Sequence, residues 1–262
     1  MVPDISEFSY GFALTRELIA LTGDLKAAPV FPSLIAEGKK GGGYDVNLDI
    51  PGFPLFIQFK RSECMVRRTA RETRSPMNFA TPFYRMKIAE RSRSAQHEML
   101  LDLDGGPNEV FYAAPLFHTV EELNKAYLAN SVSAQSCYVR PSKIGKLDGE
   151  AHHVAFDKKR FWVCSDPRQT EGLHGAELGT ALERRLGSES RSFRDGPLGE
   201  RLSFVEEILG RRNISSASSR EPIAASGLEP IAALTDSQLQ RLGELSFQYF
   251  GAQLFIVQRR EH

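Results

Sequence analysis

Three polar residues, Asp45, Gln58 and Lys60, lie in two neighbouring segments whose side chains alternate between apolar and polar. Carboxylate and amide oxygens are ligands that a hard cation such as Mg²⁺ prefers. A lysine beside such a cation can position the attacking water, take its proton or neutralise a phosphate. These residue types therefore suit metal-assisted hydrolysis of a phosphodiester, provided that the fold brings them together.

The segments 44–50 and 55–60 have the period-two pattern of half-buried β-strands. Residues 51–54, Pro-Gly-Phe-Pro, separate them with turn chemistry. A four-residue turn would make a hairpin with Ile50 opposite Leu55, Asn47 opposite Gln58, and Asp45 opposite Lys60. Directly opposed Cβ atoms lie roughly 5 Å apart. The polar side chains would then converge, whereas a slip of one residue would separate them.

The spacing of Asp45 and Gln58-Phe59-Lys60 resembles the Asp…(Asp/Glu/Gln)-x-Lys signature of the PD-(D/E)xK nuclease superfamily. The resemblance covers roughly residues 5–130. It implies a restriction-endonuclease-like core of the α/β (α+β) class, with a mixed central sheet flanked by helices. It also implies a metal-dependent nuclease that uses Mg²⁺ or Mn²⁺, favours DNA over RNA, and has Asp45, Gln58 and Lys60 as catalytic residues. The simpler alternative is a solvated polar face on an ordinary hairpin.

Gln58 carries one negative charge fewer than the glutamate that is more common in this signature, so the site should bind Mg²⁺ more weakly unless another acid contributes. Nucleases that this chain resembles often supply an acidic ligand from the first helix, where it has Glu17. Glu37, eight residues before Asp45, is the second candidate. The sequence does not choose between them. The expected metal ligands are Asp45 and Gln58 with either Glu37 or Glu17.

Basic residues gather directly after the predicted hairpin. Between Arg61 and Arg93 there are nine basic residues and three acidic ones, in a chain whose net charge is +0. Such a local excess can contact phosphates, although a solvated loop is the simpler explanation. The expected nucleic-acid contacts are Arg61, Arg67, Arg68, Arg71, Arg74 and Arg85, together with Gln96 at the start of the next helix.

The remaining pattern predicts alternating strands and helices, followed by a mostly helical C-terminal part. Before residue 130 we expect a helix after Asp4 that ends at Gly23, a strand at 83–88, a helix at 94–103, a strand at 109–115 and a helix from 119. After it we expect strands at 136–139, 153–156, 161–164 and 254–257, helices at 176–186, 198–209 and 235–250, and an irregular linker at 214–234. The chain would then comprise a nuclease-like core, 1–130, and an extension, 131–262, that packs on it or continues the same domain.

Whole-chain properties limit the setting more than the activity. The three cysteines are widely spaced and match no zinc motif, which favours a reducing compartment. No apolar run approaches the roughly 18 residues that span a membrane, so we expect a cytoplasmic protein. Oligomerisation stays open. A role in bacterial or antiviral defence, or in toxicity, would suit a small nuclease by association only.

Two alternatives belong to other functional classes. The first keeps the fold without the chemistry, as an inactive nuclease-like module that binds nucleic acid or a protein partner. The second is an enzyme for another substrate built from His118, His152 and His153. A metal site at His152 and His153 is not favoured, because adjacent residues of a strand point to opposite faces.

Overall fold

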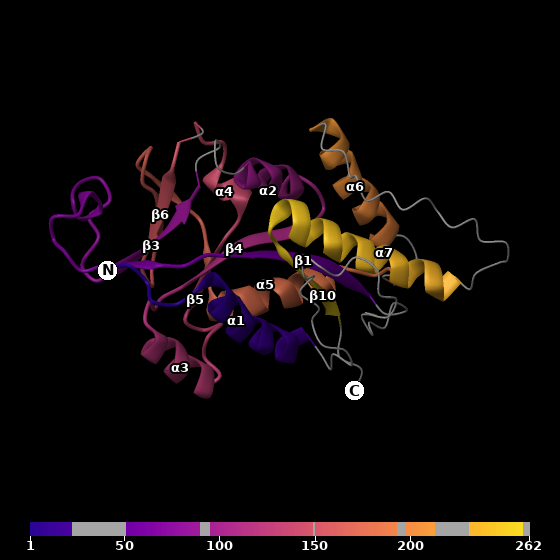
Figure 1. Cartoon of the computed structure of the whole chain (residues 1–262), viewed down its shortest axis with the longest axis horizontal. Helices are drawn as coiled ribbons and strands as arrows, with labels where there is room; N and C mark the ends of the chain where they lie inside the picture. The colour runs from indigo at the N-terminus through magenta and orange to yellow at the C-terminus, as the bar shows by residue number, and fades with distance from the viewer. Residues whose placement is uncertain (23–50, 90–94, 149, 193–196, 213–230, 259–262) are drawn as a thin grey trace.

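The structure is a computed structural model that describes residues 1–22, 51–89, 95–148, 150–192, 197–212 and 231–258. Within these ranges the chain is a mixed α/β protein with two five-stranded sheets and seven α-helices. Helices cover both faces of the first sheet (Figure 1). None of the described helices is both long and apolar enough to cross a membrane.

The first sheet has the order β10-β1-β4-β5-β9. Its strands are β1 (Gly52–Phe59), β4 (Glu109–Pro115), β5 (Ser136–Val139), β9 (Leu173–His174) and β10 (Gln253–Gln258). β1 runs parallel to β4, and every other pairing in this sheet is antiparallel. β1 and β4 are almost entirely buried, as expected for central strands that are covered on both faces.

The helices divide between the two faces of this sheet. One face is covered by α1 (Glu7–Thr22), α3 (Val120–Leu128) and α5 (Gly175–Gly187). The other is covered by α2 (Gln96–Asp104), α4 (Pro141–Ile144), α6 (Pro197–Arg211) and α7 (Ile231–Leu245). Leu55 and Ile57 of β1 pack in the hydrophobic core beneath α1, α3 and α5, whereas Phe56 packs in the core on the opposite face. β1 therefore contributes to both cores.

The second sheet has the order β2-β3-β6-β7-β8 and is antiparallel throughout. Its strands are β2 (Glu63–Met65), β3 (Phe83–Ile88), β6 (His152–Phe156), β7 (Phe161–Val163) and β8 (Arg168–Thr170). Met86, Ile88 and Val154 on its inner face join the core beneath α2. The segment 66–82, which includes the 3₁₀-turn η1 (Arg71–Thr73), lies at the end of the molecule near the N-terminus (Figure 1).

Most of the predicted elements are confirmed. α3 begins at the predicted cap, where the Thr119 side chain accepts from the Glu122 N–H and Glu122 closes a capping box. The predicted final helix continues through the short π-helix η2 (Ser246–Phe250) and ends at Gly251, whose φ of 59° is left-handed. Residues 231–234, which were expected in the linker, instead form the first turn of α7.

The predicted hairpin is wrong in its pairing. β1 begins inside the expected turn, and both of its edges are occupied, by β10 and by β4. Leu55, which was expected opposite Ile50, pairs with Phe255 and Glu109 instead. The segment 44–50 lies outside the described residues. Phe8 and Phe12 of α1 are exposed, so the buried face of this helix does not include them.

The chain after residue 130 completes both sheets. β5, β9 and β10 belong to the first sheet, and β6, β7 and β8 belong to the second. The described residues of this part therefore form six strands as well as helices, and β10 pairs directly with β1.

Candidate active site

β1 places Gln58 and Lys60 on one face of the first sheet, because alternate residues of a strand point to the same side. Phe56, on the same face, packs in the core beneath α2, α6 and α7. Gln58 lies opposite Tyr112 on the parallel strand β4. The backbone N–H of Lys60 donates to the carbonyl of Ala113 at 2.8 Å. The end of a central strand therefore holds both predicted side chains.

Gln58 has a free acceptor in a buried position. Its side chain is 4% exposed, and its amide oxygen Oε1 has no hydrogen-bond partner among the described residues. An unsatisfied buried polar group typically costs about 1–3 kcal/mol. This oxygen is therefore available to a cation or to a donor from outside the described ranges.

Gln96 lies beside Gln58, next to Gly251. Around the position that a Cβ on Gly251 would take, the Nε2 atom of Gln96 is 1.8 Å away and that of Gln58 is 3.5 Å away. A larger residue at 251 would therefore collide with Gln96. Gly251 also adopts a φ of 59°, which favours glycine. The helical glutamine predicted near the site thus shares a small polar space with Gln58.

Lys60 is partly buried at the end of β1. Its Nζ lies 5.8 Å from the centre of the Tyr112 ring, within the range of a cation–π contact. Burial lowers the pKa of Lys60 below its ordinary value of 10.5, and the nearby charge of Glu7 only partly opposes this shift. Lys60 can therefore release its proton at a lower pH than an exposed lysine.

Tyr112, which contacts Lys60, is also hydrogen-bonded to His97. The hydroxyl of Tyr112 is 2.8 Å from Nδ1 of His97, and Nε2 of His97 is 2.8 Å from the carbonyl oxygen of Gly145. Because a carbonyl only accepts, Nε2 carries the proton and Nδ1 accepts from the tyrosine. Burial lowers the pKa of His97, which favours this neutral form.

Tyr112 and the carbonyl of Gly145 were not predicted from the sequence. Tyr112 lies in a strand that reads as apolar, and only its register against Gln58 reveals its place in the site. The one available signal was its hydroxyl group, because a buried tyrosine usually needs a hydrogen-bond partner.

The expectation that Glu17 ligates a metal beside Gln58 is not met. Its two carboxylate oxygens accept backbone N–H bonds from Val132 and Ser133, each at 2.8 Å. α1 and Val132 belong to the core on the face of the sheet opposite that of Phe56. Glu17 therefore fixes the loop before β5, which leaves Glu37 as the candidate acid.

Asp45 and Glu37 lie outside the described residues. Within the described ranges, no group of three or more His, Cys, Asp or Glu side chains is arranged to hold a metal ion. Of the predicted ligands, only Gln58 is both described and in place, and its unpaired oxygen matches the oxygen ligands that Mg²⁺ prefers.

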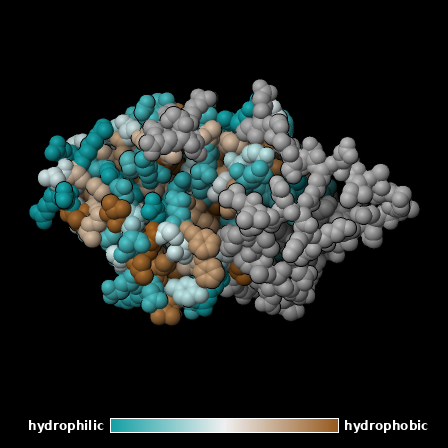
Figure 2. Space-filling model, viewed as in Figure 1, coloured by the Kyte–Doolittle hydropathy of each residue, from teal (hydrophilic) through white to brown (hydrophobic). Residues whose placement is uncertain are grey.

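The predicted nucleic-acid contacts fall into two groups. The side chains of Arg61, Arg67, Arg68, Arg71 and Arg74 are exposed, and no ion pair holds them within the described part of the chain. Four of them lie in the segment 66–82, at an end of the molecule with a hydrophilic outer edge (Figure 2). Arg85 differs, because its Nε is 2.7 Å from Glu63 and its Nη1 is 3.1 Å from Glu72. Arg85 is therefore already neutralised by two carboxylates.

The three histidines of the alternative enzyme do not converge. His118 lies beside Glu122 at the start of α3, with an Nδ1 to Oε2 distance of 3.0 Å. His152 and His153 point to opposite faces of β6, as their adjacency predicted. His152 is buried, and its charge contributes to lowering the pKa of His97. His153 instead lines a pocket together with Arg85.

No family model matches the sequence, and no curated protein or solved structure matches it. The residues above are therefore the basis for any assignment of function.

Proposed function

We propose that this chain is a metal-dependent nuclease whose active site lies at the end of β1. The observation that carries the proposal is the buried, unpaired oxygen of Gln58 beside a lysine whose pKa is lowered. This pair keeps the spacing of the Gln-x-Lys signature, on one face of a central strand. Desolvated groups with shifted pKa values are typical of catalytic sites.

The order of elements supports the same proposal. After β1 and the short strand β2 come β3, α2 and β4, and β4 returns parallel to β1. A strand, a helix and a central strand after the lysine-bearing strand is the order that the resemblance to PD-(D/E)xK nucleases implies, although β3 belongs to the second sheet. α2 brings Gln96 to Gln58, in the position of a helical glutamine near the site.

Each residue then has a defined role. Gln58 would hold Mg²⁺ or Mn²⁺ through its amide oxygen, together with Asp45 and Glu37. The cation supplies a water that ionises near neutral pH and a counter-charge for the phosphate. Lys60 would either accept a proton from the attacking water, a role that its lowered pKa favours, or neutralise the scissile phosphate in its charged form. Tyr112 and neutral His97 form the wall beside Lys60.

Cleavage assays test the proposal. Supercoiled plasmid, single-stranded DNA and RNA are incubated with the protein and Mg²⁺ or Mn²⁺, with DNA expected to be the preferred substrate. Removing a general base or charge stabiliser typically lowers the rate about 10²-fold or more, so Lys60→Ala and Asp45→Ala should lose cleavage. Lys125→Ala, an exposed lysine on α3, serves as the matched control. Cleavage that persists in both site variants would falsify the assignment.

The exposed arginines support a second candidate function, in which the chain binds nucleic acid without cutting it. Arg67, Arg68, Arg71 and Arg74 offer phosphate contacts that do not depend on Gln58 or Lys60. Salt-sensitive binding with no cleavage under either metal would favour this second function over the first.

A further inference from the structure

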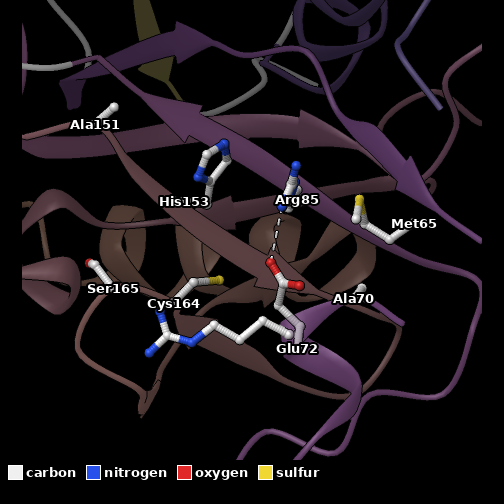
Figure 3. Close-up of a pocket in the computed structure, with 9 residues that line it drawn as sticks. Met65, Ala70, Glu72, Arg85, Ala151, His153, Cys164 and Ser165 are labelled. Atoms are coloured by element: carbon white, nitrogen blue, oxygen red, sulfur yellow. Dashed lines mark hydrogen bonds and ion pairs between the residues drawn. The ribbon is translucent and has the colours of Figure 1, made fainter. Parts of the chain in front are cut away.

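A second polar site lies on the face of the second sheet that points away from the core beneath α2. A pocket of about 320 Å³ opens there, lined by the second sheet and by part of the segment 66–82 (Figure 3). Its lining includes Arg71, Glu72, Arg85 and His153, with Met65 and Ala70 as apolar walls. This volume lies at the lower end of the range for small-molecule sites and suits a ligand of about the size of a nucleotide.

The register of β3 and β6 gathers basic side chains on this face. Arg85 pairs with Ala155, and His153 lies two residues away on the same side of β6. Lys87, which is exposed, pairs directly with His153. Diagonal neighbours on one face of such a pair lie roughly 7–8 Å apart. The pairing of the strands therefore places Arg85, Lys87 and His153 within reach of one ligand.

Two carboxylates hold the Arg85 guanidinium in a fixed orientation. Its Nε donates to Glu63 at 2.7 Å, and its Nη1 donates to Glu72 at 3.1 Å. Glu72 is 4% exposed, so this ion pair is shielded from water. The Nη2 atom makes no hydrogen bond within the described part of the chain. Arg85 is therefore preorganised and still has donors for a ligand.

The charge around the pocket is positive on balance. The segment 66–82 contains four arginines and one acidic residue, Glu72. Of these arginines, Arg71 lines the pocket, and it has no ion pair among the described residues. Glu63 and Glu72 offset the charge of Arg85, but Arg71 and Lys87 have no such carboxylate in the described ranges. The pocket therefore attracts an anion.

The donors of the pocket suit a phosphate. Guanidinium groups bind phosphate through pairs of parallel hydrogen bonds. Burial and the charge of Arg85 lower the pKa of His153, whereas a bound dianion would favour its protonated form, in which both ring nitrogens donate. A phosphate monoester carries nearly two charges at neutral pH, because its second pKa is about 6. It therefore gains more from these groups than a phosphodiester, which carries a single charge.

We propose that this pocket binds the terminal phosphate monoester of a nucleic-acid strand, with Arg71 and Arg85 as the guanidinium contacts and His153 as a further donor. The proposal rests on the proposed function only in taking nucleic acid as the ligand, and it requires neither a metal nor cleavage. Arg67, Arg68 and Arg74, exposed in the same segment, contact the internal phosphates of that strand. A free nucleotide carries the same monoester without the internal phosphates.

Binding to three versions of one short single-stranded DNA tests the proposal. They carry a 5′-phosphate, a 3′-phosphate or two hydroxyl ends, with a fluorophore on an internal base. Anisotropy is measured with EDTA present, so that no metal-dependent cleavage occurs. We expect one phosphorylated version to bind about tenfold more tightly than the hydroxyl version, the effect of a hydrogen bond between charged groups. Equal affinities for all three versions would overturn the proposal.

Competition with adenosine 5′-monophosphate distinguishes the two sources of the monoester once this preference is measured. If the nucleotide removes the preference, the pocket also accepts a free nucleotide. If it does not, the pocket needs the strand as well as its end. Either result supports the site, because both depend on the preference for a phosphorylated end.

Two arginine variants locate the preference in the pocket. Arg71→Gln should reduce the roughly tenfold preference to near unity, because it removes the unpaired charge from the lining. Arg74→Gln, which removes an exposed arginine of the same segment outside the lining, should weaken all three complexes alike and keep the preference. The same preference in both variants would overturn the proposal.

Lys60→Ala separates this site from the proposed active site. The variant should lose cleavage and keep the preference for a phosphorylated end, because Lys60 does not line the pocket. A preference without any cleavage by the unmodified protein would support the pocket while contradicting the nuclease. Cleavage without a preference would do the reverse.

Discussion

At the scale of single residues, Lys60 is the side chain whose protonation most directly affects the proposed reaction. Burial lowers its pKa from 10.5, so its neutral form is reached at a lower pH than that of an exposed lysine. If Lys60 takes a proton from water, the cleavage rate should rise about tenfold per pH unit until the lowered pKa and then level off. A pH–rate profile measures this break.

Lys60→Arg separates a base from a fixed charge. The guanidinium stays protonated at every assay pH, so it can neutralise a phosphate without acting as a base. If the pH–rate profile of this variant is flat and its cleavage rate is reduced, Lys60 acts as a base. An unchanged profile assigns Lys60 to phosphate neutralisation and the break to another group.

His97 predicts a loss of stability in mild acid. Its folded-state pKa lies below the ordinary value of 6.5, because burial disfavours the charged ring. The unfolded chain therefore binds the proton first as the pH falls, and the stability contributed by neutral His97 is complete above 6.5 and is lost as the pH drops through the folded-state pKa.

His97→Gln should remove this acid-dependent loss. It should also cost about 1–3 kcal/mol at neutral pH, because a glutamine does not replace both hydrogen bonds. Urea unfolding at a series of pH values measures both effects. A variant that retains the full slope below pH 6.5 would assign the loss to another group.

At the scale of elements, the junction between η2 and β10 fixes the site through Gly251. Gly251→Ala should destabilise the protein by about 1–3 kcal/mol, because an alanine at a φ of 59° is strained, and the end of the Gln96 side chain would also have to move away from its Cβ. Gly179→Ala is the matched control, since no atom lies within 4 Å of a Cβ at this helical position. It should be neutral or stabilising. Equal midpoints in urea for the two variants would contradict the tight junction.

The elements themselves could be predicted from the sequence where the signal is local. The box formed by Thr119 and Glu122 marks the start of α3, and the apolar run at 109–115 gives a central strand. The predicted hairpin was wrong because strand pairing is not a local property. Alternation assigned Gln58 and Lys60 to one face, but it carries no information about which strand lies beside them.

At the scale of the whole molecule, the first sheet depends on contacts between distant parts of the chain. β1 pairs with a strand from the C-terminal end and with β4, so the edge predicted for 44–50 is occupied. Such pairings arise from global packing and not from local pattern. Tyr112 could not be predicted as part of the site for the same reason, because its position opposite Gln58 follows only from the parallel register of β1 and β4.

The charge distribution predicts the salt dependence of nucleic-acid binding. Arg67 and Arg68 are exposed in the segment 66–82. If both contact phosphates, Arg67→Gln combined with Arg68→Gln should make the slope of log K against log salt concentration less negative by about 1.5. The control pair, Lys125→Gln with Arg184→Gln, removes two exposed charges elsewhere and should leave the slope unchanged. If the two double variants have equal slopes, the segment 66–82 does not contact the nucleic acid.

The most direct test of the central claim is the effect of Mn²⁺ on the side-chain amide signal of Gln58 in an NMR spectrum, since a paramagnetic ion broadens only nearby nuclei. We predict that substoichiometric Mn²⁺ broadens this signal before that of Gln135, an exposed glutamine before β5. Asp45→Asn should abolish the selective effect. If the Gln58 signal is unchanged at Mn²⁺ concentrations that support cleavage, the metal is bound elsewhere and the proposed site is wrong.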